Sequence, residues 1–359
     1  MSKTHIPFSL YMSQSLYDEQ NGYYANAQRV GTKGDFYTSV SASKFFGGAI
    51  ASYILSLLEN GDLSLPLRIV EVGADKGYLL GDIALFLDAL SHNVLQECTF
   101  ITLEPFASLA QIQMAHLASL SFSTPLHFAT FRDCASCPLP NTPTSLFVIA
   151  NELFDSFPCE VIKEDTMLYI SQDSPSWRGM WGEIEDKTKE LLQNLALCHT
   201  ALNPVQYSGI LPLWQPFIAS LAHFAKAHTQ SYIVNFDYGN FDENQNTLQS
   251  NPRFFSTHTM QTLASFLAQN GDFKTLYQKV DITYDVDFTL LDMLLRQAGF
   301  TAIFGSSQAK VLIEQMRLLE LLESFHTQKG FSAYFKEIHK VKTLLHTMGE
   351  RFKGVCYKM

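Results

Sequence analysis

Apolar and polar positions between residues 67 and 151 alternate between two kinds of pattern. Continuous apolar runs, typical of buried parallel strands, are separated by stretches whose apolar residues recur at helical spacing. The strand-like runs are residues 67–73, 99–104, 126–130 and 145–151, and the helical stretches are 77–90 and 107–120. Strands that alternate with helices connect by right-handed crossovers. The pattern therefore predicts an α/β, Rossmann-like fold built on a doubly wound, mostly parallel sheet.

The flanking segments predict further elements around this sheet. The apolar run 45–58 predicts a buried helix, and the turn-rich segment 160–185 predicts an antiparallel insert. We also expect helices over 211–228, 257–267, 288–298, 310–325 and 330–348, and strands over 231–239, 300–305 and 351–357. The simplest organisation is an N-terminal helical and loop region, 1–65, that packs on the ligand site of a single domain, 66–359. Inserts in that domain are expected at about 160–210 and 240–287.

A glycine turn follows the first predicted core strand. It has the sequence Gly73-Ala74-Asp75-Lys76-Gly77, and an acid, Glu104, ends the next strand. Glycines let the backbone approach a ligand, and a strand-end acid accepts hydrogen bonds from ribose hydroxyls. Asp75 would repel a pyrophosphate, which argues against NAD, whereas S-adenosyl-L-methionine (SAM) has no phosphate and carries a cationic amino group. The alternative is an ordinary turn in which Gly77 serves only packing.

Composition and charge narrow the possible partners and compartment. The chain has 359 residues, of which 47% are hydrophobic, and its net charge is −10 with no long basic cluster, so nucleic-acid binding is not expected. The apolar run 45–58 is too short to span a membrane. No secretion-signal pattern opens the sequence, so we expect a cytoplasmic protein with reduced cysteines. The pair Cys134 and Cys137 lacks partners at metal-ligand spacing, so no metal site is expected.

Polar residues at the ends of the predicted strands are the candidate site, because ligands bind beyond the carboxyl ends of strands in open α/β sheets. The segment Asn151-Glu152-Leu153-Phe154-Asp155 brings two carboxylates and an amide to that edge. Methyl transfer requires mainly positioning and desolvation, and carboxylates would also hold a guanidinium acceptor. Glu152 and Asp155 suit this role, with Asp35 in a loop that could close over the site. A turn or helix cap is the alternative for Asp133 and Asp155.

These motifs together resemble the MidA family of SAM-dependent methyltransferases, which includes a mitochondrial complex I assembly factor that methylates a protein arginine. The most specific matches are KGDFYTS (33–39), NELFD (151–155) and DITYDVDF (281–288). Further matches include NGYY (21–24), LEP (103–105), FDYG (236–239) and MGERFKG (348–354). Their order and spacing agree with the family over nearly the whole chain.

The resemblance implies a class I methyltransferase fold, SAM as methyl donor and a protein arginine as acceptor, in a respiratory complex I (NADH dehydrogenase) subunit or a related protein during assembly. The residues expected to bind the cofactor are Gly73, Ala74, Asp75, Gly77, Glu104, Asp133, Asn151, Thr38 and Ser39. The residues expected to be catalytic are Asp35, Glu152 and Asp155. Lys33 and Gly34 belong to the same N-terminal signature as Asp35.

Departures from the family pattern leave a second reading open. The family turn is usually G-P-G-R-G, whereas this chain has Ala74 and Asp75 at the proline and the middle glycine, and Val40 and Ser41 follow the T-S pair where the family has a proline. A catalytically weakened assembly chaperone that retains the fold is therefore the alternative to an enzyme. A dinucleotide oxidoreductase fits the acidic turn poorly.

Overall fold

The chain gathers into two compact units in a computed structural model that describes residues 5–25, 38–172, 175–196, 207–241, 248–256 and 259–359. Unit 1 comprises Met1–Phe36, Phe154–Pro216 and Gly239–Leu294, and unit 2 comprises Tyr37–Leu153, Phe217–Tyr238 and Leu295–Met359. The expected inserts at 160–210 and 240–287 lie in unit 1, whereas the expected N-terminal region 1–65 is divided between both units.

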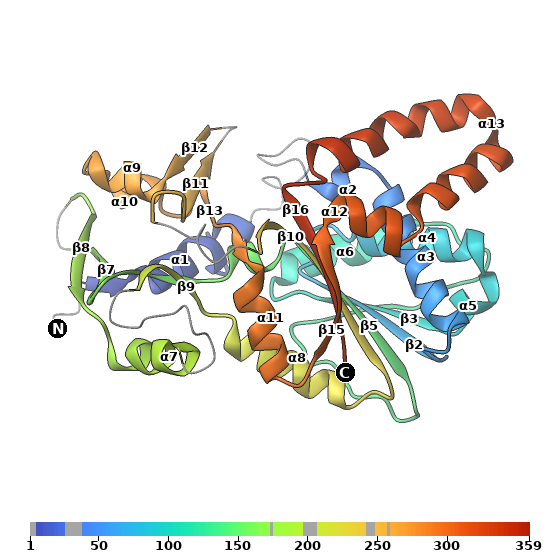
Figure 1. The fold of residues 1–359 in the computed structure, drawn as a ribbon, viewed down its shortest axis with the longest axis horizontal. Coiled ribbons are helices and arrows are strands. Elements are labelled where there is room, and N and C mark those ends of the chain that lie inside the picture. The colour runs from blue at the N-terminus through green and yellow to red at the C-terminus, as the bar shows by residue number, and fades with distance from the viewer. Residues whose placement is uncertain (1–4, 26–37, 173–174, 197–206, 242–247, 257–258) are drawn as a thin grey trace. The chain divides into compact units, whose positions relative to one another are not determined.

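Unit 2 is built on the predicted sheet, in the strand order β15-β16-β10-β5-β2-β3-β4 (Figure 1). The strands are β2 (Leu67–Val72), β3 (Cys98–Leu103), β4 (Phe128–Phe131), β5 (Ser145–Asn151), β10 (Ser231–Asn240), β15 (Thr301–Ser307) and β16 (Phe352–Lys358). The strands from β4 to β10 pair in parallel, and β16 pairs antiparallel with both of its neighbours. This confirms the predicted doubly wound, mostly parallel sheet.

The register of this sheet aligns the carboxyl ends of its central strands. Val72 at the end of β2 stands opposite both Leu103 of β3 and Ala150 of β5. Asn151 of β5 stands opposite Phe236 of β10. The residues that follow these strands therefore emerge next to one another, which is the edge where the sequence predicts the site.

Helices cover both faces of the sheet of unit 2. In Figure 1, α8 lies on one side and α3, α4 and α5 on the other. The helices are α2 (Ser39–Ala42), α3 (Phe45–Glu59), α4 (Tyr78–Leu90), α5 (His92–Gln96), α6 (Ala107–Ser119), α8 (Gln215–Lys226), α12 (Gln308–Lys310) and α13 (Leu318–Lys342), with π-helical segments at Val311–Gln315 and Thr343–Thr347. In the chain, α11 (Phe288–Gln297) is divided between the units after Leu294. The predicted buried helix is α3.

Two glycines let α3 pack closely on its neighbours in the core. A Cβ atom added to Gly47 would lie 2.7 Å from Cβ of Asp82, on α4. One added to Gly48 would lie 2.8 Å from the Phe86 ring and 2.9 Å from Leu321 of α13. Larger residues would separate these helices, so the glycines fix a close approach of helix to helix beneath the site.

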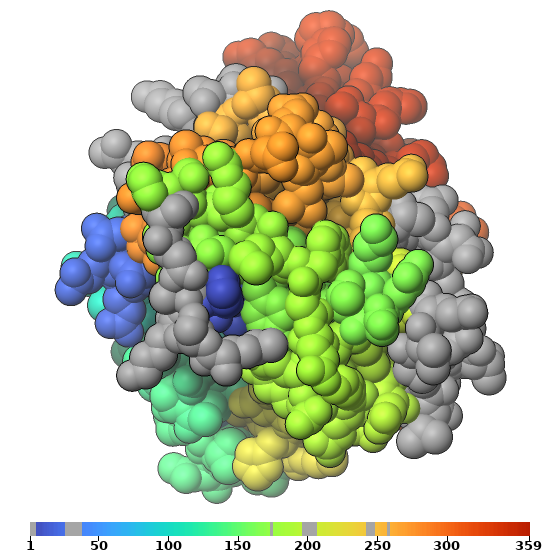
Figure 2. Space-filling model, turned by 90° about the vertical axis from the view of Figure 1, so that its left-hand side faces the viewer, coloured from blue at the N-terminus to red at the C-terminus, as the bar shows by residue number. Residues whose placement is uncertain are grey.

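Unit 1 consists mainly of antiparallel strands. One sheet contains β1 (His5–Pro7), β6 (Cys159–Lys163), β7 (Thr166–Ser171), β8 (Arg178–Glu183) and β9 (Ser208–Pro212), and a second contains β11 (Arg253–Ser256), β12 (Thr259–Thr262) and β13 (Asp281–Thr283). The remaining elements are α1 (Phe8–Tyr17), α7 (Asp186–Ala196), α9 (Leu263–Ala268), α10 (Phe273–Leu276), β14 (Val286–Asp287), and 3₁₀ turns at Tyr23–Ala25 and Phe154–Ser156. Figure 2 faces this unit, with the segment around β7 and β8 in green and the segment around β11 and α10 in orange.

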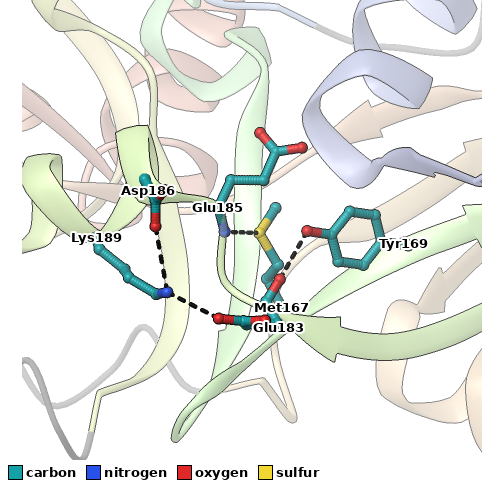
Figure 3. A network of polar contacts seen from close by, with 6 residues as sticks. All are labelled: Met167, Tyr169, Glu183, Glu185, Asp186 and Lys189. Atoms are coloured by element: carbon teal, nitrogen blue, oxygen red, sulfur yellow. Dashed lines mark hydrogen bonds and ion pairs between the residues drawn. The ribbon is translucent and has the colours of Figure 1, made fainter. Parts of the chain in front are cut away.

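Polar contacts attach the start of α7 to the β7–β8 hairpin of unit 1 (Figure 3). Lys189 donates to Glu183 at 3.1 Å and to Asp186 at 3.4 Å. The Tyr169 hydroxyl donates to the Glu183 carbonyl at 2.7 Å, and the Glu185 N–H donates to the Met167 sulfur at 3.3 Å. The predicted antiparallel insert is thus the strands β6, β7 and β8, with α7 held against the β7–β8 hairpin.

Three predicted helices differ from the structure. The stretch 211–228 begins as strand β9, whose Leu211 pairs with Glu160 of β6, and the helix starts only at Gln215. Within 257–267, residues Thr259–Thr262 form β12 and only Leu263–Ala268 is α-helical. Helix 310–325 breaks at Arg317, which has φ 55°. Short apolar runs fit either state, and pairing with another strand decided the first two: β9 pairs with the distant β6, and β12 with its neighbour β11.

Candidate functional site

The turn after β2 is a left-handed backbone excursion that leads into α4. Gly73, Asp75 and Gly77 have φ values of 66°, 44° and 79°. The Gly73 N–H donates to the Leu103 carbonyl at 3.0 Å, and the Gly77 N–H donates to the Ala74 carbonyl at 2.7 Å. Aspartate tolerates the left-handed region better than most residues, which explains how Asp75 replaces a glycine without unfolding the turn.

Glu104 lies buried immediately after β3, and both of its carboxylate oxygens are hydrogen bonded. The Phe106 N–H donates to Oε1 at 3.1 Å, and the Gln113 amide donates to Oε2 at 2.9 Å. The Glu104 N–H donates to the Phe131 carbonyl at 2.8 Å, at the end of β4. These contacts hold the carboxylate in one orientation at the carboxyl edge of the sheet.

Gln113 connects this acid to the glycine turn and was not singled out from the sequence. Its amide nitrogen also donates to the Asp75 carbonyl at 3.0 Å, so one side chain of α6 holds both Glu104 and the turn. Both neighbours are acceptors, which sets the orientation of the amide. A glutamine within an ordinary amphipathic helix gives no local signal of this role. Gln113 is nine residues from Glu104 in the sequence, and the two side chains meet only because α6 packs on the turn.

Acidic groups cluster at this edge. Glu71, near the end of β2, is buried and accepts a hydrogen bond from the Leu80 N–H of α4 at 3.0 Å. Burial raises the pKa of Glu71 to about 8 and that of Glu104 to about 7, and repulsion from Asp75 adds to both shifts. A cluster of buried acids favours a ligand with positive charge and hydroxyl donors, and disfavours a pyrophosphate.

The end of β5 brings four of the predicted site residues together. Glu152 Oε1 accepts hydrogen bonds from the Ser39 N–H at 3.2 Å and from the Asn151 amide at 3.3 Å. Ser39 is the first residue of α2, and Thr38 caps that helix by a reciprocal pair of hydrogen bonds with Ser41. The carboxylate of Glu152 therefore accepts from a first-turn N–H of α2, a group that has no partner within the helix itself.

The backbone at Glu152 adopts an uncommon conformation that the surroundings hold in place. Its φ is 50°, and its N–H donates to the Phe236 carbonyl of β10 at 2.8 Å. The next N–H, of Leu153, donates to the buried carboxylate of Asp237 at 3.1 Å. Asn151 Oδ1 is buried and, within the described part of the chain, has no hydrogen-bond partner. Non-glycine residues with a left-handed backbone conformation cluster at functional sites, which supports a functional role for the corner formed by Asn151 and Glu152.

Two of the remaining candidates, Asp155 and Asp133, have other hydrogen-bond partners in the structure. Asp155 belongs to unit 1, where its Oδ2 accepts from the Thr283 hydroxyl at 2.8 Å and its carbonyl accepts from the Tyr284 N–H at 3.2 Å. Asp133 is exposed after β4 and accepts from the Ser136 N–H at 2.8 Å, as a turn cap does. Asp35, with Lys33 and Gly34, lies outside the described residues. The assignments of Asp133, Asp155 and Asp35 to the site stay predictions.

The cysteine pair and the apolar helices singled out from the sequence lie in the part of the chain that the structure describes. Cys134 and Cys137 are buried thiols, and burial raises the pKa of Cys134 to about 12. In the described ranges, the structure contains no group of histidine, cysteine and acidic residues arranged to hold a metal ion. Nor does any described helix combine the length and apolar character needed to cross a bilayer.

Comparison with known proteins identifies the family to which this chain belongs. A family model described as "Putative S-adenosyl-L-methionine-dependent methyltransferase" matches residues 49–305. The sequence is 22% identical to the protein arginine methyltransferase NDUFAF7 homolog, mitochondrial, of Drosophila melanogaster, over 98% of this chain and 81% of that protein. It is 24% identical to the NDUFAF7 protein of Xenopus tropicalis, over 97% of this chain and 81% of that protein.

A solved structure agrees in fold. A protein from Burkholderia thailandensis, crystallised with S-adenosyl-homocysteine, matches with a TM-score of 0.76 at 20% identity, covering 99% of this chain and 88% of that chain. The doubly wound sheet and this match define a class I methyltransferase fold. The chain belongs to the MidA family of SAM-dependent methyltransferases, on the family model and the relatives together. SAM is its cofactor.

The residues at the carboxyl edge of the sheet fit SAM. The cofactor carries a cationic sulfur, a cationic amino group and ribose hydroxyls, and it has no phosphate. Glu104 is oriented to accept from the hydroxyls, and the carboxylate of Asp75 in the turn would attract rather than repel the ligand's positive charge. The left-handed turn between Gly73 and Gly77 lets the backbone approach it.

Proposed function

We propose that this protein transfers the methyl group of SAM to an arginine of a protein substrate, in a respiratory complex I subunit or a related protein during assembly. The similarity to proteins named as arginine methyltransferases over nearly the whole chain supports the proposal. The observation that carries it is Glu152, a carboxylate held at the end of β5, on the sheet edge that also presents the glycine turn and Glu104.

The chain's own residues would act by positioning and charge. Bound SAM supplies a methyl group carried on a positively charged sulfur. Glu104, fixed by Gln113, would orient the ribose. Glu152, fixed by the Ser39 N–H and the Asn151 amide, would hold the guanidinium of the acceptor and stabilise the charge that it keeps after transfer. Rigid support of this kind is what an in-line displacement requires of a protein.

Substitution of Glu152 by glutamine tests this proposal, because it removes the charge and keeps the shape. Labelled SAM incubated with host lysate first identifies the acceptor band. With that acceptor, Glu152→Gln should leave SAM affinity within about threefold and reduce methyl transfer at least about a hundredfold, as expected for loss of one positioned electrostatic group. Glu164→Gln is the matched control, since Glu164 is an exposed glutamate that also has a positive φ, of 56°.

Two outcomes would count against the proposal. Near-normal transfer by Glu152→Gln would assign its carboxylate a structural role at the start of α2. Failure of the unaltered protein to bind SAM in calorimetry would favour the alternative, an assembly chaperone that retains the fold. Asp75 in the turn, where the family has a glycine, is the reason for considering that alternative.

A cytoplasmic location, proposed from the sequence, is tested by cell fractionation.

A further inference from the structure

The C-terminal part of unit 2 carries an exposed aromatic surface at the bend of a helical hairpin. Helix α13 folds back on itself at Gly330, whose φ is 76° and ψ 171°, so that two helical arms meet at that residue (Figure 1). Phe331 and Phe335, just after the bend, are 67% and 50% exposed. Among the large hydrophobic residues that the structure describes, Phe331 is the most exposed.

The exposed aromatics form one stripe along the second arm. Phe331 and Phe335 lie one helical turn apart with their ring centroids 5.8 Å apart, and His339 continues the stripe 4.8 Å from Phe335. Tyr334 and Ile338, each three residues after a ring of the stripe, pack against the hydrophobic core. The stripe therefore adjoins the core-facing side of the arm and extends its apolar surface into solvent.

Lysines are frequent at the bend and along the second arm, in an otherwise acidic protein. The second arm, residues 331–342, contains Lys336, Lys340 and Lys342 against the single acid Glu337, a formal charge of +2 in a chain whose net charge is −10, and Lys329 lies directly before the bend. The first arm carries Glu320 and Glu323, so the positive charge belongs to the bend and the second arm. Lys340 pairs with Glu337 at 3.2 Å, and the side chain of Glu337 is mostly buried. All four lysines are exposed. The bend therefore presents phenylalanine rings within a local field of positive charge.

The size of the apolar surface decides between a protein partner and a lipid surface. The two rings together expose roughly 180–290 Å², taking about 150–250 Å² for a whole aromatic side chain. A stable protein interface buries about 800 Å² on each partner. A bilayer interface, in contrast, accepts single aromatic side chains between headgroups and attracts nearby lysines when its lipids are anionic. We propose that the bend of α13, around Phe331 and Phe335, is a docking site for an anionic phospholipid membrane surface.

Vesicle sedimentation of the full chain tests the proposal. The protein should sediment with phosphatidylcholine vesicles that contain phosphatidylglycerol, much less with phosphatidylcholine alone, and less at high salt because the attraction is screened. Phe331→Ser/Phe335→Ser should weaken the partition coefficient at least about tenfold, since it removes two inserted aromatic side chains. Lys329→Glu/Lys336→Glu should weaken it by a similar factor through charge.

Matched controls separate this surface from general stickiness and from misfolding. Leu90→Ser alters an exposed apolar residue at the end of α4, and Lys226→Glu alters an exposed lysine of α8; both should sediment as the unaltered protein does. Circular dichroism melts of the bend variants should match the unaltered protein because the altered side chains are exposed. Absence of sedimentation with anionic vesicles would overturn the proposal, as would equal sedimentation of the bend variants. Concentration-dependent self-association that requires Phe331 would instead make the bend a contact between copies.

Discussion

At the residue scale, Gln113 is the side chain whose role depends most on a single orientation. Its amide nitrogen holds the Glu104 carboxylate and the Asp75 carbonyl, so Gln113→Leu should release both while filling a similar volume. Loss of a hydrogen bond to a charged group weakens binding by about 1.5–3 kcal/mol, or roughly tenfold or more in affinity. Calorimetric titration with SAM measures the change, with Gln111→Leu on the exposed side of α6 as the control. Equal dissociation constants for both variants would remove Gln113 from the site.

Glu71 makes the stability of the unliganded protein depend on pH. Burial raises its pKa from 4.5 to about 8, so the folded state keeps a proton that the unfolded state has released. Its contribution to stability is therefore fully present below pH 4.5 and is lost as the pH rises toward about 8. Glu71→Gln keeps an acceptor for the Leu80 N–H and should flatten the fall in melting temperature over this range. If the melting temperature of Glu71→Gln falls with pH as steeply as that of the unaltered protein, groups other than Glu71 cause the fall.

At the element scale, the turn between β2 and α4 depends on backbone conformation more than on space. A Cβ atom at Gly77 would lie 3.5 Å from Gln113, an ordinary contact, but the φ of 79° is strained for any L side chain. Gly77→Ala should therefore destabilise the protein by about 1–2 kcal/mol and weaken SAM binding. Asp75→Gly should change stability by less than about 1 kcal/mol and keep binding, because glycine accepts this conformation. Urea unfolding measures the first effect; loss of SAM binding by Asp75→Gly would show that the aspartate is itself a ligand.

At the scale of the whole molecule, the cofactor should stabilise unit 2 in particular. The turn, Glu104, Gln113, Asn151 and Glu152 all belong to that unit. S-adenosyl-homocysteine at about a hundred times its dissociation constant should add about 2.7 kcal/mol, or roughly 5–10 °C in the melting temperature of a unit of this size. Hydrogen exchange should show the added protection at residues 71–77 and 104–113, and at 151–152. Protection of unit 1 without protection of these segments would place the ligand elsewhere.

Much of this architecture could be read from local pattern. The strands of unit 2 and helices α4, α6 and α11 lie within a few residues of their predicted bounds, because buried strands and amphipathic helices carry their period in neighbouring residues. The glycine turn, the acid after β3 and the corner at Asn151 and Glu152 were predicted for the same reason, since strand-end positions follow from the strands. The family resemblance rested on short segments whose order survives at about 22–24% identity.

Other features exist only because distant segments meet. Strand β9 is a strand because Leu211 pairs with Glu160, and no local period distinguishes it from the start of the helix that was predicted there. Gln113 became part of the site when α6 packed on the turn, and Asp155 accepts a hydrogen bond from Thr283, a residue of unit 1 that is far from it in the sequence. The sequence determined the elements and the chemistry at their ends, since both are local. Tertiary structure decided which side chains share a hydrogen bond, because that depends on groups far apart in the chain.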